Sequence, residues 1–404
     1  RNNTTGRNNT FLGSRTGYNN GAGNDNVMIG YFAGESSVGT FNSVFLGYES
    51  GENATGGNNT FLGYRTGREA TTASSNVFVG NSSGTNLTTG TNNIFLGVSA
   101  GFSAQTSNSV FIGRSAGANT TANGNVFVGF NSGTANTSGT SNVFLGANSG
   151  EDNTTGSQNT MIGFQAGQNN SSGNNNTILG FQSGALNTTG SSNTFLGYHT
   201  GRRNTTGSSN VFIGEFSGED NTTGIGNTSI GKNALQNNTT ANGNVAIGFG
   251  SGLNTTTGGS NTMIGLSSGN QNTSGQDNTF IGGAAGNRNT IGNNNTYIGR
   301  FSGRTNVTSS NNTFLGFESG EESTVSNSTF VGYQAGNVTT GANNTFLGYQ
   351  SGVVNTTGSE NTFLGINAGL ANTTEGSNTY IGYNSGVLNN GRQNVFIGAN
   401  SGEN

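Results

Sequence analysis

Residues able to carry out acid–base or metal chemistry are few in this chain and lie far apart. The 404 residues include a single histidine, His199, and no cysteine. Metal centres and acid–base sites need several such groups to converge, and a lone histidine in a variable position is typical of a surface residue. The sequence therefore predicts neither a metal site nor a catalytic histidine.

The acidic residues do not recur at a fixed position either. The aspartates are Asp25, Asp152, Asp220 and Asp277, whereas a calcium-binding β-roll repeats Asp in every turn. Adjacent acids such as Glu321 and Glu322 could supply two carboxylates for glycoside cleavage, but neighbouring carboxylates in a turn are typical of solvated charge. We expect no enzyme activity, no catalytic residue and no cofactor.

The charge balance and hydropathy exclude two further classes of function. The chain has 13 basic residues against 17 acidic ones, and Lys232 is its single lysine. Nucleic-acid binding needs a basic patch, which this composition does not provide. Because no apolar run reaches the 18 residues that a membrane-spanning helix requires, we expect no membrane insertion.

A short repeat runs through the whole sequence. An aliphatic residue followed by glycine recurs 24 times at a spacing of 16 or 17 residues, with reference glycines from Gly13, Gly30 and Gly47 onward to Gly398. A fixed period of this length is typical of a solenoid, whose units cannot bury a hydrophobic face alone. No linker or change of composition divides the chain, so we expect residues 1–404 to form one continuous repeat array without caps.

Two positions before each reference glycine are always aliphatic or β-branched. The residue directly before the glycine is Leu, Ile or Val (the Leu/Ile row), and the residue three before it is Thr, Val or Ile (the Thr/Val row). Residues two apart share one face of a strand, and β-branched residues favour strands. We expect an all-β parallel β-solenoid, or β-roll, of 24 coils, with two short strands and two turns per coil and with these two rows inside.

The position between those two rows is large and mostly aromatic. This aromatic row has tyrosine at Tyr297 and Tyr380, methionine in three copies, and Ile178, Ser229 and Ala246 as exceptions. Because the row lies on the opposite strand face, we expect it to point outward and to be covered by another copy of the chain. The predicted self-association residues are Phe11, Phe45, Phe61, Phe78, Phe95, Phe111, Phe127, Phe144, Phe195, Phe212, Phe280, Phe314, Phe330, Phe346, Phe363 and Phe396. The alternative is that the chain bends at the glycine, so that both faces point inward from different walls.

The remaining positions are polar or small. The residue four before the glycine is Asn in 21 copies and Ser in three (the Asn row), which predicts a ladder of amides between stacked coils. Many copies later read Asn-Thr-Thr-Gly, as expected for an outward turn. Its asparagines are also glycosylation acceptors in sequence, although Asn and Thr are equally explained as turn residues. The candidate acceptors are Asn153, Asn187, Asn204, Asn221, Asn355 and Asn372.

The strings Asn227–Gly231 and Asn244–Gly248, which read NTSIG and NVAIG, carry a resemblance. The chain resembles the head repeats of trimeric autotransporter adhesins and the related arrays of tail-fibre-like bacterial surface proteins. In those families Asn or Ser, a β-branched residue, a small residue, Ile and Gly recur in each coil of a parallel β-roll. The resemblance implies three chains side by side, an extracellular or cell-surface location, and a binding or spacer role.

These observations lead to one expected function and one alternative. We expect an extracellular structural filament or adhesin array that associates with copies of itself, with surface glycans or a host surface as further partners. The alternative is a monomeric solenoid that binds carbohydrate or ice. Ice binding requires rows of Thr on an exposed strand face, and we expect the Thr/Val row to be interior. Since both ends of the chain lie within repeat sequence, we also expect it to be part of a longer array or to join end to end.

Overall fold

The computed structural model describes residues 2–402, and this part of the chain contains strands and turns but no helix. Contacts between Cα atoms divide the chain into two units, Arg1–Thr206 and Gly207–Asn404, which we describe separately. The strands of unit 1 are β1 (Thr10–Leu12), β2 (Val27–Ile29), β3 (Val44–Leu46), β4 (Thr60–Leu62), β5 (Val77–Val79), β6 (Ile94–Leu96), β7 (Val110–Ile112), β8 (Val126–Val128), β9 (Val143–Leu145), β10 (Thr160–Ile162), β11 (Thr177–Leu179) and β12 (Thr194–Leu196). Those of unit 2 are β13 (Val211–Ile213), β14 (Thr228–Ile230), β15 (Val245–Ile247), β16 (Thr262–Ile264), β17 (Thr279–Ile281), β18 (Thr296–Ile298), β19 (Thr313–Leu315), β20 (Thr329–Val331), β21 (Thr345–Leu347), β22 (Thr362–Leu364), β23 (Thr379–Ile381) and β24 (Val395–Ile397).

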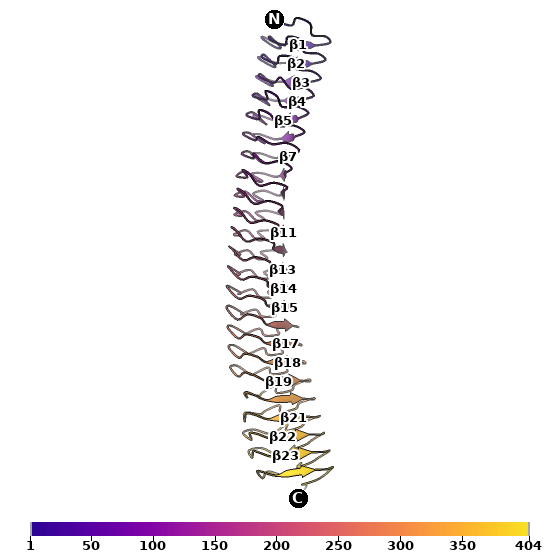
Figure 1. Cartoon of the computed structure of the whole chain (residues 1–404), viewed down its shortest axis with the longest axis vertical. Coiled ribbons are helices and arrows are strands. Elements are labelled where there is room, and N and C mark those ends of the chain that lie inside the picture. Colours follow the sequence, from indigo (N-terminus) through magenta and orange to yellow (C-terminus); the bar gives the residue numbers. More distant parts are fainter. Residues whose placement is uncertain (1, 403–404) are drawn as a thin grey trace. The chain divides into compact units, whose positions relative to one another are not determined.

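Within each unit, consecutive strands pair in parallel and in the register of the repeat. Thr60 lies beside Val77 and Phe61 beside Phe78 in unit 1, and the same pairing recurs in unit 2. Figure 1 shows the coils of each unit stacked one above the next. The expectation of an all-β parallel β-solenoid with one repeat per coil is therefore confirmed.

Each repeat contains one three-residue strand, not the two strands we expected. The rest of the coil consists of turns and bends. Its backbone still bonds from coil to coil, for example from the Gly67 N–H to the Ser83 carbonyl at 2.9 Å and from the Glu69 N–H to the Thr85 carbonyl at 2.9 Å. Backbone groups outside the strand are thus satisfied by the neighbouring coil, which is what stacking requires.

The reference glycine follows each strand for a steric reason. Gly63 has a φ of 142°, and a Cβ atom there would lie 2.3 Å from the carbonyl oxygen of Gly80 in the next coil. A second glycine four residues later, Gly67, has a φ of 59°, and its Cβ would lie 2.5 Å from the ring of Phe61. Both contacts are too short for any side chain, so the two glycines are required by coil stacking and by the interior ring.

The aromatic row lies inside the coil, which contradicts the sequence-based assignment. Of the predicted self-association residues, the structure gives 0% exposure for Phe45, Phe61, Phe78, Phe95, Phe111, Phe127, Phe144, Phe195, Phe212, Phe280, Phe314, Phe330, Phe346 and Phe363. Phe11 and Phe396 are half-buried in the first and last coils. Successive rings stack face to face, with centroids 4.6 Å apart between Phe78 and Phe95 and 4.6 Å apart between Phe314 and Phe330. These rings form the core of each unit and are not available to another chain.

The physical reason is volume. Apart from the aromatic row, the interior positions are mostly filled by Ser, Ala, Thr, Gly and Asn, so one large side chain per coil must fill the centre. The coil is too narrow for both strand faces to point inward, and the Thr/Val and Leu/Ile rows therefore point outward. The alternative in which both faces point inward is also wrong.

In one coil of unit 2 the large interior side chain comes from a different position of the repeat. Ser229 occupies the aromatic row of β14, and in that coil alone the second glycine is replaced, by Leu235. Leu235 is fully buried and packs in the core cluster with Ala246 and Met263. Its side chain occupies space that a phenylalanine ring fills in other coils, at the cost of a left-handed backbone with a φ of 47°.

The Asn row forms the expected amide ladder. The side-chain oxygen of Asn59 accepts the backbone N–H of Asn76 at 3.0 Å, and the Asn76 oxygen accepts that of Asn93 at 2.9 Å. The Asn76 amide nitrogen also donates to the Gly90 carbonyl at 2.9 Å. Each side chain therefore bonds to the next coil, and the ladder satisfies buried backbone groups at the turn before the strand.

Candidate interaction surface

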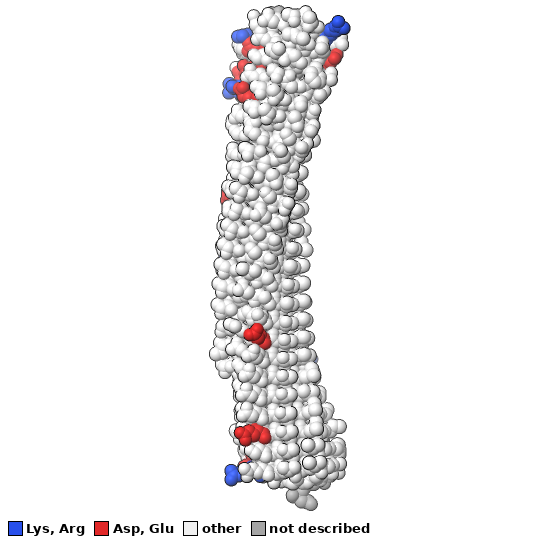
Figure 2. Space-filling view, in the orientation of Figure 1, with Lys and Arg blue, Asp and Glu red and all other residues white. Residues whose placement is uncertain are grey.

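The outward strand face consists of the Thr/Val row and the Leu/Ile row. Val44 is 40% exposed and Leu62 is 41% exposed, while the Phe61 ring between these rows in β4 is fully buried. Across all 24 repeats these two rows contain only Thr, Val, Ile and Leu, and none of the 30 charged residues. Figure 2 shows a face of the molecule on which Lys, Arg, Asp and Glu are confined to a few places.

A third outward row consists of the residue directly after each reference glycine. This row (the outer row) is often aromatic. In unit 1, Tyr31, Tyr48 and Tyr64 stack with centroids 5.5 and 5.3 Å apart, and Tyr64 is 42% exposed. In unit 2, Tyr333 and Tyr349 stack at 5.1 Å. Because the ring faces cover one another, these stacks present ring edges to solvent and form an apolar ridge beside the strand face.

The outward face is large enough to bind a macromolecule. At ~4.8 Å between strands and ~3.3 Å per residue, twelve strands and the outer row span about 13 Å by about 53 Å, or ~700 Å² in each unit. Isolated apolar patches on soluble monomers are ~300–600 Å², and a stable protein interface covers ~800 Å² on each partner. The outward face of either unit is therefore somewhat larger than the usual apolar patch of a monomer, and its only charged residues lie in the outer row, at Arg114 in unit 1 and at Glu215, Lys232 and Arg300 in unit 2.

The two units differ in the chemistry of the Thr/Val row. In unit 1 the row is mainly Val or Ile from β2 to β9, with Thr60 as the exception, whereas in unit 2 it is Thr in every strand from β16 to β23. Those eight threonines point outward, as the burial pattern of their strands shows. The expectation that this row is interior, on which we had argued against ice binding, is wrong.

The six candidate glycosylation sites are interior. Asn153, Asn187, Asn204, Asn221, Asn355 and Asn372 all have 0% exposure. Asn153, Asn187, Asn204 and Asn221 belong to a second amide ladder, in which the Asn187 side-chain nitrogen donates to Asn170 Oδ1 at 2.8 Å and to the Gly190 carbonyl at 2.9 Å. Both hydrogens of that nitrogen are used, so a sugar cannot be attached to Asn187 in the folded coil. Asn355 donates only to the Gly358 carbonyl in its own turn, and Asn372 is buried without a ladder bond. The Asn-Thr-Thr turn directs its threonines outward and its asparagine inward.

One cluster of ionic groups lies in the early coils of unit 1. Arg65 pairs with Glu49 at 2.8 Å, and Arg68 lies 3.4 Å from Glu52 and 2.8 Å from Glu69. Partial burial, and then the neighbouring Glu49 carboxylate, raise the pKa of Glu52. Carboxylates and guanidinium groups of adjacent coils thus pair with one another, which is the arrangement of a surface ion-pair network.

The described residues contain no group of three or more His, Cys, Asp or Glu side chains that could hold a metal ion. His199 lies at a corner of its coil with a φ of 54°, and its ring stacks on Tyr198 with centroids 3.9 Å apart. In residues 2–402 there is also no helix with the length and apolar character needed to cross a membrane.

The sequence identifies the three rows of the strand, but the prediction that the Thr/Val and Leu/Ile rows are interior and the aromatic row is exterior is reversed in the structure. Two signals in the sequence indicate the correct orientation: the polar residue Thr in 14 of the 24 copies of the Thr/Val row, and the replacement of Gly by Leu235 opposite Ser229. The outer row could not be identified from the sequence, because its position varies between aromatic, aliphatic, small and charged residues.

In comparisons with known proteins, no family model matches the chain and no curated protein is significantly similar to it in sequence.

Proposed function

We propose that this chain is an extracellular structural or adhesive array that associates with copies of itself through its outward strand face. The observation that carries the proposal is the pair of uncharged outward rows, Thr/Val and Leu/Ile, which continue through all 24 repeats. A solvated surface normally intersperses charges of both signs. The two uncharged rows form a strip of about 350 Å² in each unit, ~6.6 Å by ~53 Å, within an outward face of ~700 Å², and a strip without charge is typical of the core of an interface, where charged residues are depleted.

The partner that fits this face best is a second copy of the chain. The rows offer methyl groups and hydroxyls at the strand repeat of ~4.8 Å, and an identical sheet presents the same spacing and the same absence of charge. Such isologous packing is the common form of homo-oligomer contact. The proposed surface replaces the aromatic row, whose rings lie inside the coil.

Sedimentation velocity tests this proposal. The variant Leu315→Lys/Leu347→Lys/Leu364→Lys places three charges on the outward face, where these leucines are exposed. The matched control Thr340→Lys/Thr357→Lys/Thr374→Lys places the same charge on exposed turn positions. We expect the wild-type chain and the control to sediment as oligomers and the leucine variant to sediment as a monomer.

Two results would refute self-association. One is a wild-type chain that sediments as a monomer at every concentration up to its solubility limit. The other is equal loss of oligomer in the leucine variant and in the threonine control, since that would show a general effect of charge and not of the face. Electron microscopy of the same samples distinguishes a closed oligomer from an open fibre.

The outward threonines of β16–β23 support ice binding as a second candidate function. A flat sheet with regular rows of Thr methyl and hydroxyl groups can order water against an ice surface, and here the neighbouring row is aliphatic. An ice-recrystallisation assay with the variant Thr313→Lys/Thr329→Lys/Thr345→Lys tests this function. Inhibition by the wild-type monomer that is lost in the variant would favour it over self-association, and absence of inhibition by the wild-type chain would exclude it.

A further inference from the structure

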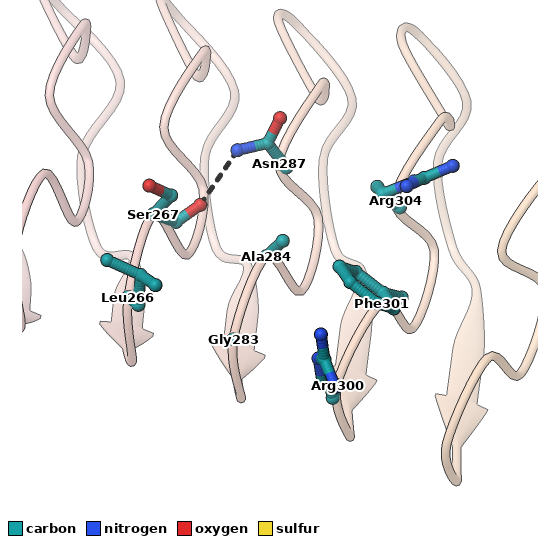
Figure 3. Close-up of a pocket in the computed structure, with 8 residues that line it drawn as sticks. All are labelled: Leu266, Ser267, Gly283, Ala284, Asn287, Arg300, Phe301 and Arg304. Carbon is teal, nitrogen blue, oxygen red and sulfur yellow. Dashed lines mark hydrogen bonds between the residues drawn. The ribbon is translucent and has the colours of Figure 1, made fainter.

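A hollow with a volume of about 390 Å³ opens on the surface of unit 2. Figure 3 shows Leu266 and Ser267 on one side, Arg300, Phe301 and Arg304 on the other, and Gly283 and Ala284 in the coil between. The hollow is of the size of small-molecule sites. It continues from the outer row toward the turn that carries Asn287.

The hollow exists because small residues interrupt a row of larger ones. The outer row reads Phe249, Leu266, Gly283, Arg300 and Phe317 in consecutive coils. Leu266 and Arg300 are two coils apart, or ~9.6 Å at ~4.8 Å per coil. Subtracting a van der Waals contact of ~3.7 Å on each side leaves space for one layer of atoms. The remaining ~2.2 Å accommodates a single ring, including a sugar chair with equatorial substituents, but not two stacked rings.

One wall of the hollow carries a positive charge without a carboxylate partner. The guanidinium of Arg304 pairs with Glu321 at 3.0 Å, whereas Arg300 forms no ion pair with any described residue. Both guanidinium groups lie over the Phe301 ring, at 4.4 Å for Arg300 and 5.1 Å for Arg304. These cation–π contacts hold the wall in place.

The nearest acidic residue to Arg300 lies in the next coil. The Glu318 backbone N–H donates to the Arg300 carbonyl at 3.0 Å, while the Glu318 carboxylate accepts from the Gln334 side chain at 2.8 Å and forms no ion pair with Arg300. On the opposite wall the Asn287 amide nitrogen donates to the Ser267 carbonyl at 3.0 Å, which fixes the side chain at the rim. The hollow therefore combines an apolar floor and wall with one unneutralised guanidinium.

We propose that this hollow binds the uronic acid residue of an acidic polysaccharide. The sugar ring lies in the gap between Leu266 and the aliphatic stem of Arg300, whose Cγ borders Gly283, and the carboxylate at the ring edge accepts two hydrogen bonds from the Arg300 guanidinium beyond the stem, the geometry that arginine favours. Because the hollow is open to solvent, a polymer continues past the bound residue on both sides. This binding does not depend on the proposed self-association.

Isothermal titration with a β-1,4-linked oligoglucuronate hexamer, whose glycosidic bonds are equatorial and leave from the ring edges, tests the site, with its fully methyl-esterified counterpart as the neutral probe. Gly283→Phe fills the gap with the residue that Phe249 and Phe317 supply at the same row position. A Cβ at Gly283 meets only Arg300 Cγ at 3.8 Å, an ordinary contact, so this variant keeps the fold. Arg300→Gln removes the free guanidinium, and Arg288→Gln removes one equal charge outside the hollow.

We expect the wild-type chain to bind the acidic hexamer and not the ester, Gly283→Phe and Arg300→Gln each to weaken binding by about tenfold or more, and Arg288→Gln to retain it. Wild-type affinity in Gly283→Phe would overturn the proposal. Equal weakening in Arg288→Gln and Arg300→Gln would do the same, since it would indicate nonspecific attraction of a polyanion.

Discussion

Leu235→Gly and Ser229→Phe form a double-mutant cycle that tests how the interior of unit 2 is filled. In the other coils the aromatic-row side chain is followed six residues later by glycine, and a Cβ there would collide with the ring, at 2.6 Å in the coil of Phe314 and Gly320. The coil of β14 has the reverse pair, Ser229 and Leu235, both fully buried. The account predicts that each single change is harmful and that the two together restore the common pattern.

The magnitudes follow from burial and backbone conformation. Removing the buried Leu235 side chain leaves a cavity that costs about 2–5 kcal/mol, and glycine at a φ of 47° recovers roughly 1 kcal/mol of left-handed strain. The single variant should therefore lose about 1–4 kcal/mol. Ser229→Phe alone overpacks against Leu235 and should lose about 1–3 kcal/mol or more. In the double variant the ring occupies the cavity, so the coupling energy should be at least ~2 kcal/mol and favourable.

Hydrogen exchange of the amides in β13–β16 measures this cycle directly, because a solenoid responds to a defect mainly in the coil concerned and its neighbours. Urea denaturation of the same four proteins gives the effect on global unfolding. Strictly additive losses in the double variant would refute the reasoning, since they would show that Ser229 and Leu235 do not share one interior space.

Three further predictions concern the same interior and surface. Phe330→Ala should cost about 3–5 kcal/mol in denaturation experiments, because the ring is buried and stacked on both sides. Leu347→Ala, at an exposed position, should cost no more than about 1–2 kcal/mol. A larger loss for Leu347→Ala than for Phe330→Ala would show that the Leu/Ile row is interior and the aromatic row exterior. Gly332→Ala puts a Cβ 2.2 Å from the Gly348 carbonyl oxygen at a φ of 138° and should lower the midpoint of thermal unfolding markedly, while Gly283→Ala, whose site is open, should leave that midpoint unchanged; equal midpoints would contradict the stacking argument. Peptide mapping of folded chain secreted by a eukaryotic cell should find no sugar on Asn187 or Asn221, and glycan on either residue in the folded protein would show that the second amide ladder is misplaced.

The period and the fold class could be predicted from the sequence because both depend on spacing alone. The 16- or 17-residue interval between reference glycines determines one coil, and the alternation of Thr, Phe and Leu in Thr345–Leu347 determines a strand with two different faces. The amide ladder also followed from a single position that is nearly always Asn. These features need no knowledge of which face is enclosed.

Which face is interior could not be obtained from periodicity, because a strand with apolar residues on both faces satisfies the pattern in either orientation. The decision depends on volumes that the rest of the coil contributes. Small residues such as Ser351 and Gly352 on the opposite wall leave room for the ring of Phe346, and a Cβ at Gly352 would lie 2.6 Å from that ring. The turn asparagines were misassigned for the same reason, since their short amides fill the interior beside these small groups.

Thiol labelling of two single-cysteine variants tests the central claim, an enclosed aromatic row and an outward face that associates. The chain has no cysteine of its own. Ser229→Cys places a thiol of similar volume at a fully buried position of the aromatic row, and Leu347→Cys places one on the exposed face. We expect the Ser229→Cys variant to react slowly with maleimide at every protein concentration. We expect the Leu347→Cys variant to react fast in dilute solution and more slowly as the chains associate. Equal rates at the two positions, or a rate at 347 that does not depend on protein concentration, would contradict it.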